Sequence, residues 1–360
     1  MKYAVVGFGT AGYHAVKKIR ELDKEGCIDV YSNTGRAPYN PMLTTYYAFG
    51  KLEYEGMFPF GDLEQIQKEV DFNLRREQVI KVHGSEHLVE TENGSEQYDR
   101  ILIATGARAF APPVKGLEPE DAFLMRTVED ALRFKDRLKK NDIKHAVVIG
   151  ASMAGIKVVE VLHKYGIETW LLDLASYIFP LAAYKEVAKE IEKRVEAQGV
   201  HLMFGVTIDH MEQENGEKTA VLTDGSRIPA DIVGLCIGTR AITETVQGEV
   251  EIGRGIVVDD HMRTSVPGIY AAGDCCEGNN LESGQNQIIG LWANANHQGE
   301  TAGINMAGGD MAYKGNILHN ITHFMNMDFI GFGDNRMQGE VLEYGSLSED
   351  LYIRLVLDGK

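Results

Sequence analysis

The chain has 360 residues, which is too long for one ordinary domain and predicts two or three domains of roughly 150 residues each. Its composition, 44% hydrophobic and 25% charged, is typical of a globular protein with sizeable cores. The formal charge of −17 argues against nucleic acid and anionic membranes as partners, because phosphate binding needs clustered Lys and Arg.

The N-terminal stretch "MKYAVVGFG" enters a strand pattern directly, and no apolar run approaches the roughly 18 residues of a membrane span. We therefore expect a cytoplasmic protein without a membrane partner. The four cysteines are Cys27, Cys236, Cys275 and Cys276, and none forms a CxxC pair. This spacing predicts no metal site and no dithiol motif. The neighbouring Cys275 and Cys276 have two interpretations, a pair of reduced thiols or a redox switch.

Residues 2–33 and 144–174 repeat one pattern. "KYAVVGFGTAGYHAVKKIRELDKEGCIDVYSN" and "KHAVVIGASMAGIKVVEVLHKYGIETWLLDL" each combine a β-branched run, a glycine turn, a helical stretch and a second β run. This is the opening βαβ unit of a nucleotide-binding fold. A single copy would leave a purely structural glycine turn as the alternative, but two copies favour two dinucleotide sites.

Each glycine of these turns has a predicted task. Gly7 and Gly150 let the chain leave its strand in a tight turn, and Gly12 and Gly155 let helix and strand pack closely. Gly9 lets the backbone approach a pyrophosphate, which the helix N-terminus then attracts. In the second turn Ser152 replaces this glycine. Its hydroxyl can donate to phosphate, so we expect weakened rather than abolished binding.

The strand ends after the two helices predict which nucleotide binds. When "GCIDVYSN" is aligned with "GIETWLLD", Asn33 lies opposite Asp173, at the position that meets the adenosine ribose. Asp173 would accept from both ribose hydroxyls and repel a 2′-phosphate, so the second site should prefer NADH to NADPH. Asn33 can bond a ribose but carries no charge.

Three further stretches indicate a family. "RILIATGARAFAPPV" contains Ala104-Thr105-Gly106, "ADIVGLCIGTRAIT" contains Gly238, and "RTSVPGIYAAGDCCE" contains Asp274. With both glycine turns, they resemble the FAD/NAD-linked pyridine nucleotide-disulfide oxidoreductase superfamily over nearly the whole chain. "SNTGRAPYNPMLTTYYAFGK" and "LWANANHQGETAGINMAG" look most like rubredoxin reductases, followed by NADH oxidases and the FAD domain of nitrite reductases.

The resemblance implies an α/β protein with two Rossmann-like domains, in which the NAD domain is inserted into the FAD domain. The expected ranges are 1–108 and 248–314 for FAD, 109–247 for NAD and 315–360 for a short C-terminal α+β interface domain. A helix from roughly Leu291 would point its N-terminus at the flavin. The implied FAD-binding residues are Gly7, Gly9, Thr10, Ala11, Gly12, Asn33, Arg36, Ala104, Thr105, Gly106, Asp274 and Trp292. The implied NAD-binding residues are Gly150, Ser152, Gly155, Asp173 and Gly238.

The sequence departs from the family at two functional positions. Where many relatives carry a redox-active cysteine it has Thr44-Thr45, so we expect neither a flavin-to-disulfide relay nor a sulfenate cycle. Lys157 stands where the family usually has a Glu close to the nicotinamide and the flavin. Three interpretations are open: a helix-surface lysine, a catalytic cation that stabilises reduced flavin or an acidic substrate, or the mark of a lost NAD site. Lys51 has two interpretations, a group that tunes the flavin or an ordinary exposed lysine.

These features favour an FAD-dependent NADH oxidoreductase that passes electrons to a carrier protein, such as a rubredoxin, or to oxygen. Two alternatives remain: an FAD relay subunit with a vestigial NAD site, and a non-catalytic FAD-binding scaffold or redox sensor. A homodimer is possible by resemblance. The ending "LYIRLVLDGK" places a hairpin turn at Asp358-Gly359 with no return strand, which predicts a shortened C-terminal domain.

Overall fold

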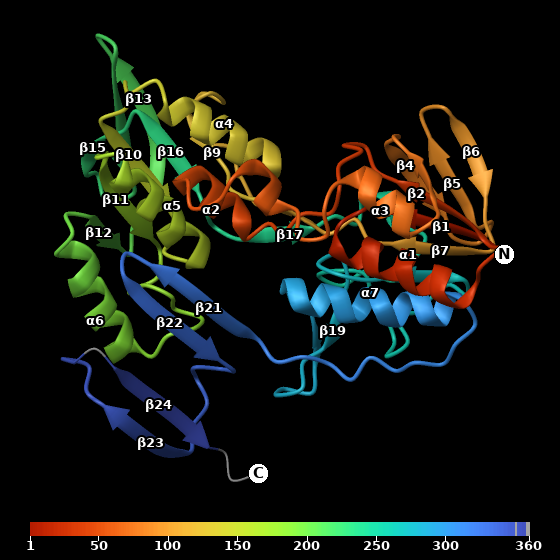
Figure 1. The fold of residues 1–360 in the computed structure, drawn as a ribbon. Coiled ribbons are helices and arrows are strands. Elements are labelled where there is room, and N and C mark those ends of the chain that lie inside the picture. Colours follow the sequence, from red (N-terminus) through yellow and green to blue (C-terminus); the bar gives the residue numbers. More distant parts are fainter. Residues whose placement is uncertain (350, 358–360) are drawn as a thin grey trace. The chain divides into compact units, whose positions relative to one another are not determined.

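A computed structural model describes residues 1–349 and 351–357. The chain packs as two compact units (Figure 1). The first comprises 1–43, 53–108 and 239–318, and the second comprises 44–52, 109–238 and 319–360. The predicted three-domain division remains a prediction. The units differ from it because the short segment 44–52 and the C-terminal segment join the second unit, and because the chain returns to the first unit at 239. The predicted turn at Asp358-Gly359 lies outside the described residues.

The first unit is built on a five-stranded sheet whose strand pairs are parallel, in the order β18-β7-β1-β2-β3. Its strands are β1 (Lys2–Val6), β2 (Cys27–Tyr31), β3 (Asn73–Arg75), β7 (Arg100–Ile103) and β18 (Ile269–Ala271). Nearly every residue of β1, β2 and β7 is buried, as expected for parallel strands covered on both faces. The sheet therefore presents its carboxyl edge, rather than a face, to ligands.

Two long helices of this unit, α1 (Thr10–Leu22) and α7 (Trp292–Met306), pack against each other (Figure 1). Small residues allow their close approach: a Cβ at Gly299 would lie 2.3 Å from the Ala11 carbonyl oxygen, and one at Gly303 would lie 2.5 Å from that of Ala15. The smaller elements are α3 (Leu63–Glu69), β4 (Val79–His83), β5 (Leu88–Thr91), β6 (Gly94–Gln97), β8 (Ala107–Ala109), β17 (Thr239–Ala241), β19 (Gly278–Asn279), β20 (Asn286–Gln287) and the 3₁₀ turns Tyr54–Met57 and Glu244–Val246. The helix predicted from roughly Leu291 is confirmed, with Leu291 as its N-cap.

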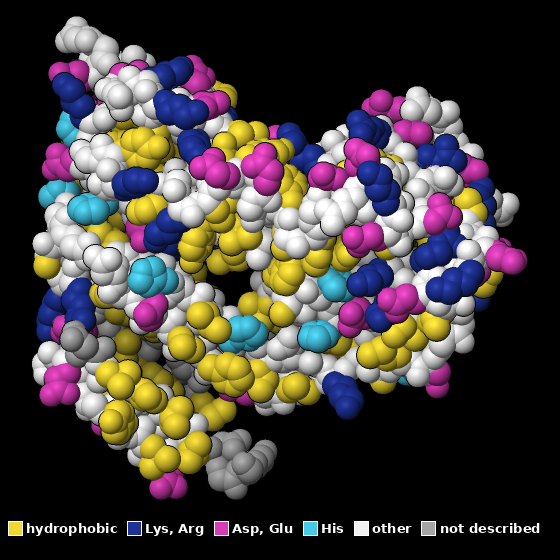
Figure 2. Space-filling view, viewed as in Figure 1, with side chains coloured by type: hydrophobic (Ala, Val, Ile, Leu, Met, Phe, Trp, Pro, Cys, Tyr) yellow, Lys and Arg dark blue, Asp and Glu magenta, His cyan; other side chains and the backbone are white. Residues whose placement is uncertain are grey.

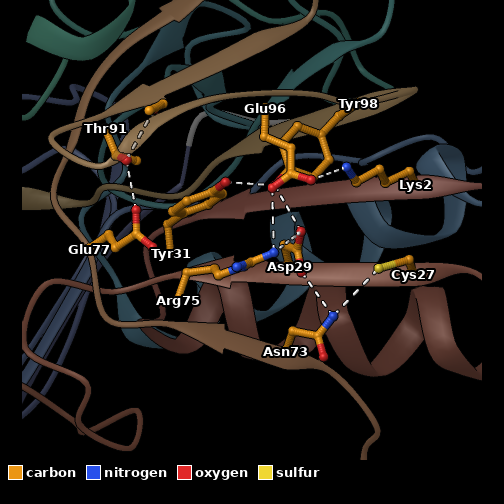
Figure 3. Close-up of polar contacts among 11 residues, drawn as sticks. Lys2, Cys27, Asp29, Tyr31, Asn73, Arg75, Glu77, Thr91, Glu96 and Tyr98 are labelled. Carbon is orange, nitrogen blue, oxygen red and sulfur yellow. Dashed lines mark hydrogen bonds and ion pairs between the residues drawn. The ribbon is translucent and has the colours of Figure 1, made fainter.

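A buried polar network fixes the end of β2 (Figure 3). Asp29 is fully buried and accepts hydrogen bonds from the Tyr98 hydroxyl at 2.9 Å and the Asn73 amide at 2.9 Å, while Arg75 lies 3.5 Å away. The Tyr31 and Tyr98 hydroxyls are 2.6 Å apart. A buried carboxylate is tolerated when it is paired in this way. The network thus holds the strand whose end faces the predicted ribose position.

The second unit repeats the plan with a parallel sheet in the order β12-β11-β10-β16-β9. Its strands are β9 (Ala122–Phe123), β10 (His145–Ile149), β11 (Glu168–Asp173), β12 (His201–Phe204) and β16 (Ile232–Leu235). A small antiparallel sheet contains β13 (Ile208–Glu214), β14 (Glu217–Leu222) and β15 (Arg227–Pro229). The helices are α2 (Leu43–Phe49), α4 (Val128–Leu138), α5 (Met153–Lys164) and α6 (Lys185–Glu196). The predicted α/β class with two Rossmann-like halves is confirmed.

The C-terminal segment forms two hairpins, β21 (His319–Phe324) with β22 (Met327–Phe332), and β23 (Glu340–Gly345) with β24 (Tyr352–Leu357). Its described residues contain no helix. Figure 2 shows apolar side chains gathered over β23 and β24. The large apolar side chains on the outer faces are 44% to 69% exposed: Ile321, Ile330, Phe332, Leu342, Tyr344, Ile353, Leu355 and Leu357. Among the described residues no helix is long and apolar enough to cross a membrane.

The strand registers correct one sequence alignment. Val6 pairs with Tyr31, and Ile149 pairs with Leu172, each directly before the first glycine of its turn. Ser32 therefore lies opposite Asp173 in the repeat, and Asn33 is one residue further on. The alignment of Asn33 with Asp173 was wrong because Gly26 directly precedes β2, whereas Gly166 lies two residues before β11, so matching these glycines shifted the strands by one residue.

Candidate functional site

The first turn is glycine-dependent at two positions. Gly7 has φ +105°, and a Cβ there would lie 2.3 Å from the Ala104 carbonyl oxygen. A Cβ at Gly12 would lie 2.2 Å from the Gly7 carbonyl oxygen. Gly9 differs, because a Cβ built on it has no described atom within 4 Å. Packing within the chain does not require this glycine, so the open space above it is a cradle that fits a pyrophosphate.

The first turn of α1 has backbone donors to offer. Its N-cap, Gly9, supplies no side-chain hydrogen bond, so the N–H groups of this turn lack the usual side-chain acceptor and suit an anion. The Thr10 hydroxyl donates to the Asn296 side chain, which ties the turn to α7. At the neighbouring strand end the Thr105 hydroxyl donates to the Ile242 carbonyl at 2.6 Å. Gly106, with φ +69°, faces open space.

The region between β18 and α7 supplies the remaining predicted flavin contacts. Asp274 follows Gly273, whose N–H donates to the Gln298 side chain at 2.8 Å. The Trp292 ring stacks on Phe60 with ring centroids 5.6 Å apart. The Trp292 indole nitrogen and the Gln298 amide nitrogen are buried without a partner among the described residues. Buried donors usually have partners, so these two fit a polar ligand beside α7.

Two further predicted FAD residues lie beside the ribose position. Asn33 is exposed and donates to the Gln78 side chain at 2.9 Å, and Arg36 donates to the Tyr54 hydroxyl at 2.6 Å. Ser32, which the sequence analysis missed, directly follows β2. Only the pairing register identifies it. The FAD-binding roles of all these residues stay predictions.

The second turn has nearly the same backbone geometry. Gly150 has φ +104° and a Cβ there would lie 2.3 Å from the Cys236 carbonyl oxygen. A Cβ at Gly155 would lie 1.9 Å from the Gly150 carbonyl oxygen. Ser152 is the N-cap of α5: its hydroxyl accepts from the Gly155 N–H at 3.3 Å and donates to the Cys236 carbonyl at 3.1 Å. The predicted phosphate donor is therefore already used within the turn.

Asp173 ends β11 and faces the second turn. One carboxylate oxygen accepts from the Ala151 N–H at 2.7 Å, and the other accepts from the Ala175 N–H at 2.8 Å. Each oxygen retains a lone pair that can accept from a ribose hydroxyl. Gly238, with φ +103°, leaves open space at the end of the next strand. These groups fit the adenosine end of a dinucleotide.

The structure overturns the interpretation of Lys157 as a helix-surface lysine, because only 3% of this residue is exposed. Its ammonium pairs with Glu160 and donates to the His323 carbonyl at 2.7 Å. It also lies 4.5 Å from the centre of the Tyr46 ring. Lys51 pairs with the other Glu160 oxygen at 3.2 Å and so is more than an ordinary exposed lysine. Glu160 is thus paired with two lysines. The positive charge at position 157, where the family usually has a Glu, is balanced by a carboxylate on the same helix.

Burial and pairing oppose each other in this cluster. Burial lowers the pKa of Lys157, although the hydrogen bond that its ammonium donates to Glu160 opposes the shift. Burial alone would raise the pKa of Glu160, but the hydrogen bond and charge of Lys157 outweigh it and the pKa is lowered. A paired cluster of this kind is destabilised when one partner is removed. The sequence could have revealed Glu160, because residues three apart share a helix face. No sequence pattern indicated that Tyr46 would lie beside Lys157 or that Lys51 would pair with Glu160.

The comparisons with known proteins agree with this geometry. The family model described as "Pyridine nucleotide-disulphide oxidoreductase" matches residues 1–299. The chain belongs to this family. It is an NAD(P)H-linked oxidoreductase, and the resemblance read from the sequence motifs is confirmed.

Curated relatives carry names from several branches of the family. The epsilon subunit of the NADH-dependent phenylglyoxylate dehydrogenase of Aromatoleum evansii is 28% identical, over 95% of this chain and 82% of that protein. An NADH oxidase of Methanocaldococcus jannaschii is 27% identical, over 86% and 70%. A rubredoxin-NAD(+) reductase of Pseudomonas putida is 27% identical, over 78% and 73%.

Solved structures confirm the fold. A NAD-dependent persulfide reductase from A. fulgidus superposes with a TM-score of 0.87 at 27% identity, over 93% of this chain. The chain spans 64% of that structure.

Proposed function

We propose that the chain is an FAD-dependent oxidoreductase that takes hydride from NADH and passes electrons to a carrier protein or to oxygen. The observation that carries this is the repeat of one turn geometry, in Gly7–Gly12 and in Gly150–Gly155, each at the carboxyl edge of its own parallel sheet. Two such turns suit two dinucleotides. The family assignment supports FAD and NAD(H) as their ligands.

The first unit would hold FAD. The open cradle at Gly9 and the first-turn N–H groups of α1 would bind the pyrophosphate, and Asp274 would bind the flavin side of the cofactor. Trp292, at the start of α7, supplies a buried N–H without a partner among the described residues. Bound FAD supplies the redox chemistry, whereas these residues bind it and set its orientation.

The second unit would hold NADH. Asp173 accepts from two backbone N–H groups and would orient the adenosine ribose through its remaining lone pairs. A 2′-phosphate would meet this carboxylate at close range, which supports a preference for NADH over NADPH. Ser152 leaves the phosphates to backbone donors, because its own hydroxyl is used within the turn.

The acceptor would be reduced without a thiol of this chain. Thr44 and Thr45, which stand where the family resemblance implies a redox-active cysteine, are buried on α2, and a hydroxyl cannot replace a thiolate. Burial raises the pKa of the Cys236 thiol to about 12, so it stays protonated at neutral pH. Cys275 and Cys276 are buried beside β18. Electrons would then go directly from the cofactor to the acceptor.

A specific observation favours a second candidate, an electron-relay subunit inside a larger enzyme. The name of the A. evansii relative describes a subunit of an NADH-dependent dehydrogenase, and the match covers 95% of this chain. The paired Lys157 also removes the free carboxylate expected near the nicotinamide. A non-catalytic scaffold is the third alternative.

An anaerobic titration of the flavin-loaded protein with NADH, and separately with NADPH, tests the proposal. Stoichiometric bleaching of the flavin absorbance by NADH, with NADPH much weaker, is expected. No bleaching by either nucleotide, with full bleaching by dithionite, would favour the relay or scaffold alternatives. Reduction by a co-purified partner would then distinguish the relay from the scaffold.

We also propose a homodimer. Exposed apolar side chains occur on β21 and β22 and gather over β23 and β24 (Figure 2), and patches of this kind mark protein contacts. Sedimentation equilibrium would show a dimer, and L342E/L355E would convert it to a monomer. A wild-type monomer would contradict this proposal.

A further inference from the structure

The starts of four neighbouring strands in the second unit bring two imidazoles and two carboxylates to one edge of the sheet. In the sheet order β12-β11-β10-β16, the first three strands begin at His201, Glu168 and His145, and Asp231 directly precedes the fourth. We call these four residues the amino-edge cluster. The second glycine turn follows the other end of β10, so the cluster lies at the opposite edge of the sheet from this turn (Figure 1).

The side chains of the cluster on β10, β11 and β12 share one face of the sheet. Successive side chains of a strand alternate between its faces, so residues two apart lie on the same face. The residues two positions further along these three strands pack in one hydrophobic cluster. Trp170 is one of them, and its ring stacks on His201 with ring centroids 4.7 Å apart. This stacking holds the His201 ring beside Glu168.

Two imidazoles approach the carboxylate of Glu168, one from each neighbouring strand. The Nε2 atom of His201 lies 2.9 Å from one oxygen, and Nε2 of His145 lies 3.8 Å from the other. Zinc ligands lie about 2.1 Å from the ion, so two ligand atoms of one tetrahedral site are roughly 3.4 Å apart. The two distances lie on either side of this value. The three side chains are 31% to 51% exposed, so both rings can turn towards an ion at the carboxylate.

Asp231 lies on the other side of the His145 ring. Its carboxylate is 3.7 Å from Nδ1 of His145 and accepts hydrogen bonds from the Lys144 and His145 N–H groups at 2.8 Å and 2.9 Å. A metal-binding histidine usually directs its second ring nitrogen at a carboxylate, which fixes the tautomer and the ring orientation. Asp231 is placed for this role, and it leaves Nε2 of His145 for an ion.

We propose that the amino-edge cluster binds a divalent transition-metal ion such as Zn²⁺. His145, His201 and Glu168 would be its ligands, since imidazole nitrogen and carboxylate oxygen suit zinc. Three protein ligands leave a fourth position for water, and a hollow of about 370 Å³ lies against Trp170 and His201. The ion would join β10, β11 and β12 at the edge that carries no nucleotide turn. The site uses no cysteine, so the cysteine spacing could not indicate it.

Two other histidines lie between carboxylates and provide the control. His210 contacts two carboxylates of its own strand, β13, at 2.7 Å and 3.0 Å. His261 contacts Asp260 at 2.6 Å and Asp310 at 2.9 Å, and ligand atoms of Asp259, Asp260 and His261 lie within 4.8 Å of one another. Each of these groups offers one imidazole, whereas the amino-edge cluster offers two. The second imidazole should therefore decide where a transition-metal ion binds.

Metal titrations of the full chain test the proposal. The wild type, H145A/H201A and the control H210A/H261A are stripped with EDTA and titrated with Zn²⁺ by calorimetry. Circular dichroism checks that each variant is folded, which is expected because the substituted side chains are on the surface. The absorption of bound Co²⁺ reports the geometry of the site. Thermal unfolding with and without Zn²⁺ gives a second measure, because an ion that binds only the folded state stabilises it.

We expect the wild type to bind one Zn²⁺ and H145A/H201A to raise its Kd about a hundredfold or more, since even the loss of an outer partner costs 10- to 100-fold. The control should change the Kd less than about twofold, and E168Q should raise it about tenfold. Zn²⁺ should raise the midpoint of thermal unfolding of the wild type and the control, but not that of H145A/H201A.

Three results overturn the proposal: no binding to the wild type at millimolar Zn²⁺, equal affinity of the wild type and H145A/H201A, or loss of binding in the control alone. The last result would place the ion at His210 or His261. None of these measurements involves NADH or the flavin. Failure of the proposed function in the NADH titration would therefore leave the metal site standing, and the reverse also holds.

Discussion

The turn of the first unit and the turn of the second unit have the same backbone geometry and leave different groups available. Gly7 and Gly150 have φ +105° and +104°, and Gly12 and Gly155 both press against the carbonyl of the first glycine. In the first turn no side chain caps the helix and Gly9 faces open space, whereas the Ser152 side chain caps the second helix and occupies the equivalent position. One turn reserves its donors for a ligand. The other uses one of them to stabilise itself.

The helices that follow the two turns also differ in the partners of their side chains. His14 and Lys157 occupy equivalent positions, two residues after Gly12 and Gly155 respectively. His14 lies 3.4 Å from Glu300 on α7, and burial lowers the pKa of His14. Lys157 pairs with Glu160 on its own helix. The first helix is thus joined to a neighbouring helix of its unit, and the second carries its own counter-charge. A fold repeat conserves backbone constraints but not the partners of side chains.

Alanine at the last glycine of each turn would break that turn and show whether the two turns are independent. In G12A and G155A the new Cβ meets a backbone oxygen at 2.2 Å and 1.9 Å. Each should destabilise its unit by about 3 kcal/mol, since neither backbone can yield cheaply. G12A should lose FAD, whereas G155A should retain FAD and lose reduction by NADH. The flavin-to-protein ratio and the NADH titration measure this.

Two other glycines provide the control for these variants. A Cβ at Gly84 or at Gly234 would make only ordinary contacts, at 3.6 Å and 3.5 Å. G84A and G234A should therefore behave like the wild type in flavin content and NADH reduction. Loss of FAD from G155A to the same degree as from G12A would show that the two turns are not independent.

Charge reversal at Lys157 gives the next largest effect. K157E would bury two carboxylates side by side and should lower the free energy of unfolding by about 3 kcal/mol. K157Q should cost about 1 kcal/mol, because Lys51 still pairs with Glu160. Urea denaturation measures both variants. If K157E were as stable as the wild type, Lys157 would not be buried with Glu160 in solution.

Substitution of Asp173 tests whether its carboxylate recognises the adenosine ribose and favours NADH over NADPH. D173N keeps the shape but replaces one acceptor by a donor, so the Kd for NADH should rise about tenfold while that for NADPH changes less. D231N is the matched control, since Asp231 also accepts from two backbone N–H groups, those of Lys144 and His145. Isothermal titration measures the affinities. Equal weakening in both variants would show that backbone capping, not ribose binding, explains the effect.

The smallest expected effect concerns Ser152. S152G makes the second turn match the first at this position, and it should change the Kd for NADH by less than about threefold, because the serine hydroxyl is used within the turn. Its free energy of unfolding should change by only a few tenths of a kcal/mol, against about 1 kcal/mol for S152A. A large gain of NADH affinity in S152G would show that Ser152 obstructs the site.

The sequence predicted the elements that depend on local constraints. Both glycine turns and the start of α7 at Leu291 agree with the structure. The alignment of Asn33 with Asp173 failed because Gly26 and Gly166 lie at different distances from the strands that follow them, which only hydrogen-bond register reveals. The burial of Lys157 could not be predicted, since a lysine on a helix is usually exposed.

The sequence by itself determined the family, the two βαβ units and the order of their motifs, because left-handed backbone and close helix-strand contact exclude every residue but glycine within a few positions. Only the tertiary structure decided which charges meet. Lys157 contacts a carbonyl 166 residues away, and Glu160 pairs with a lysine 109 residues away. Such partners come together when the chain folds, so no local pattern specifies them.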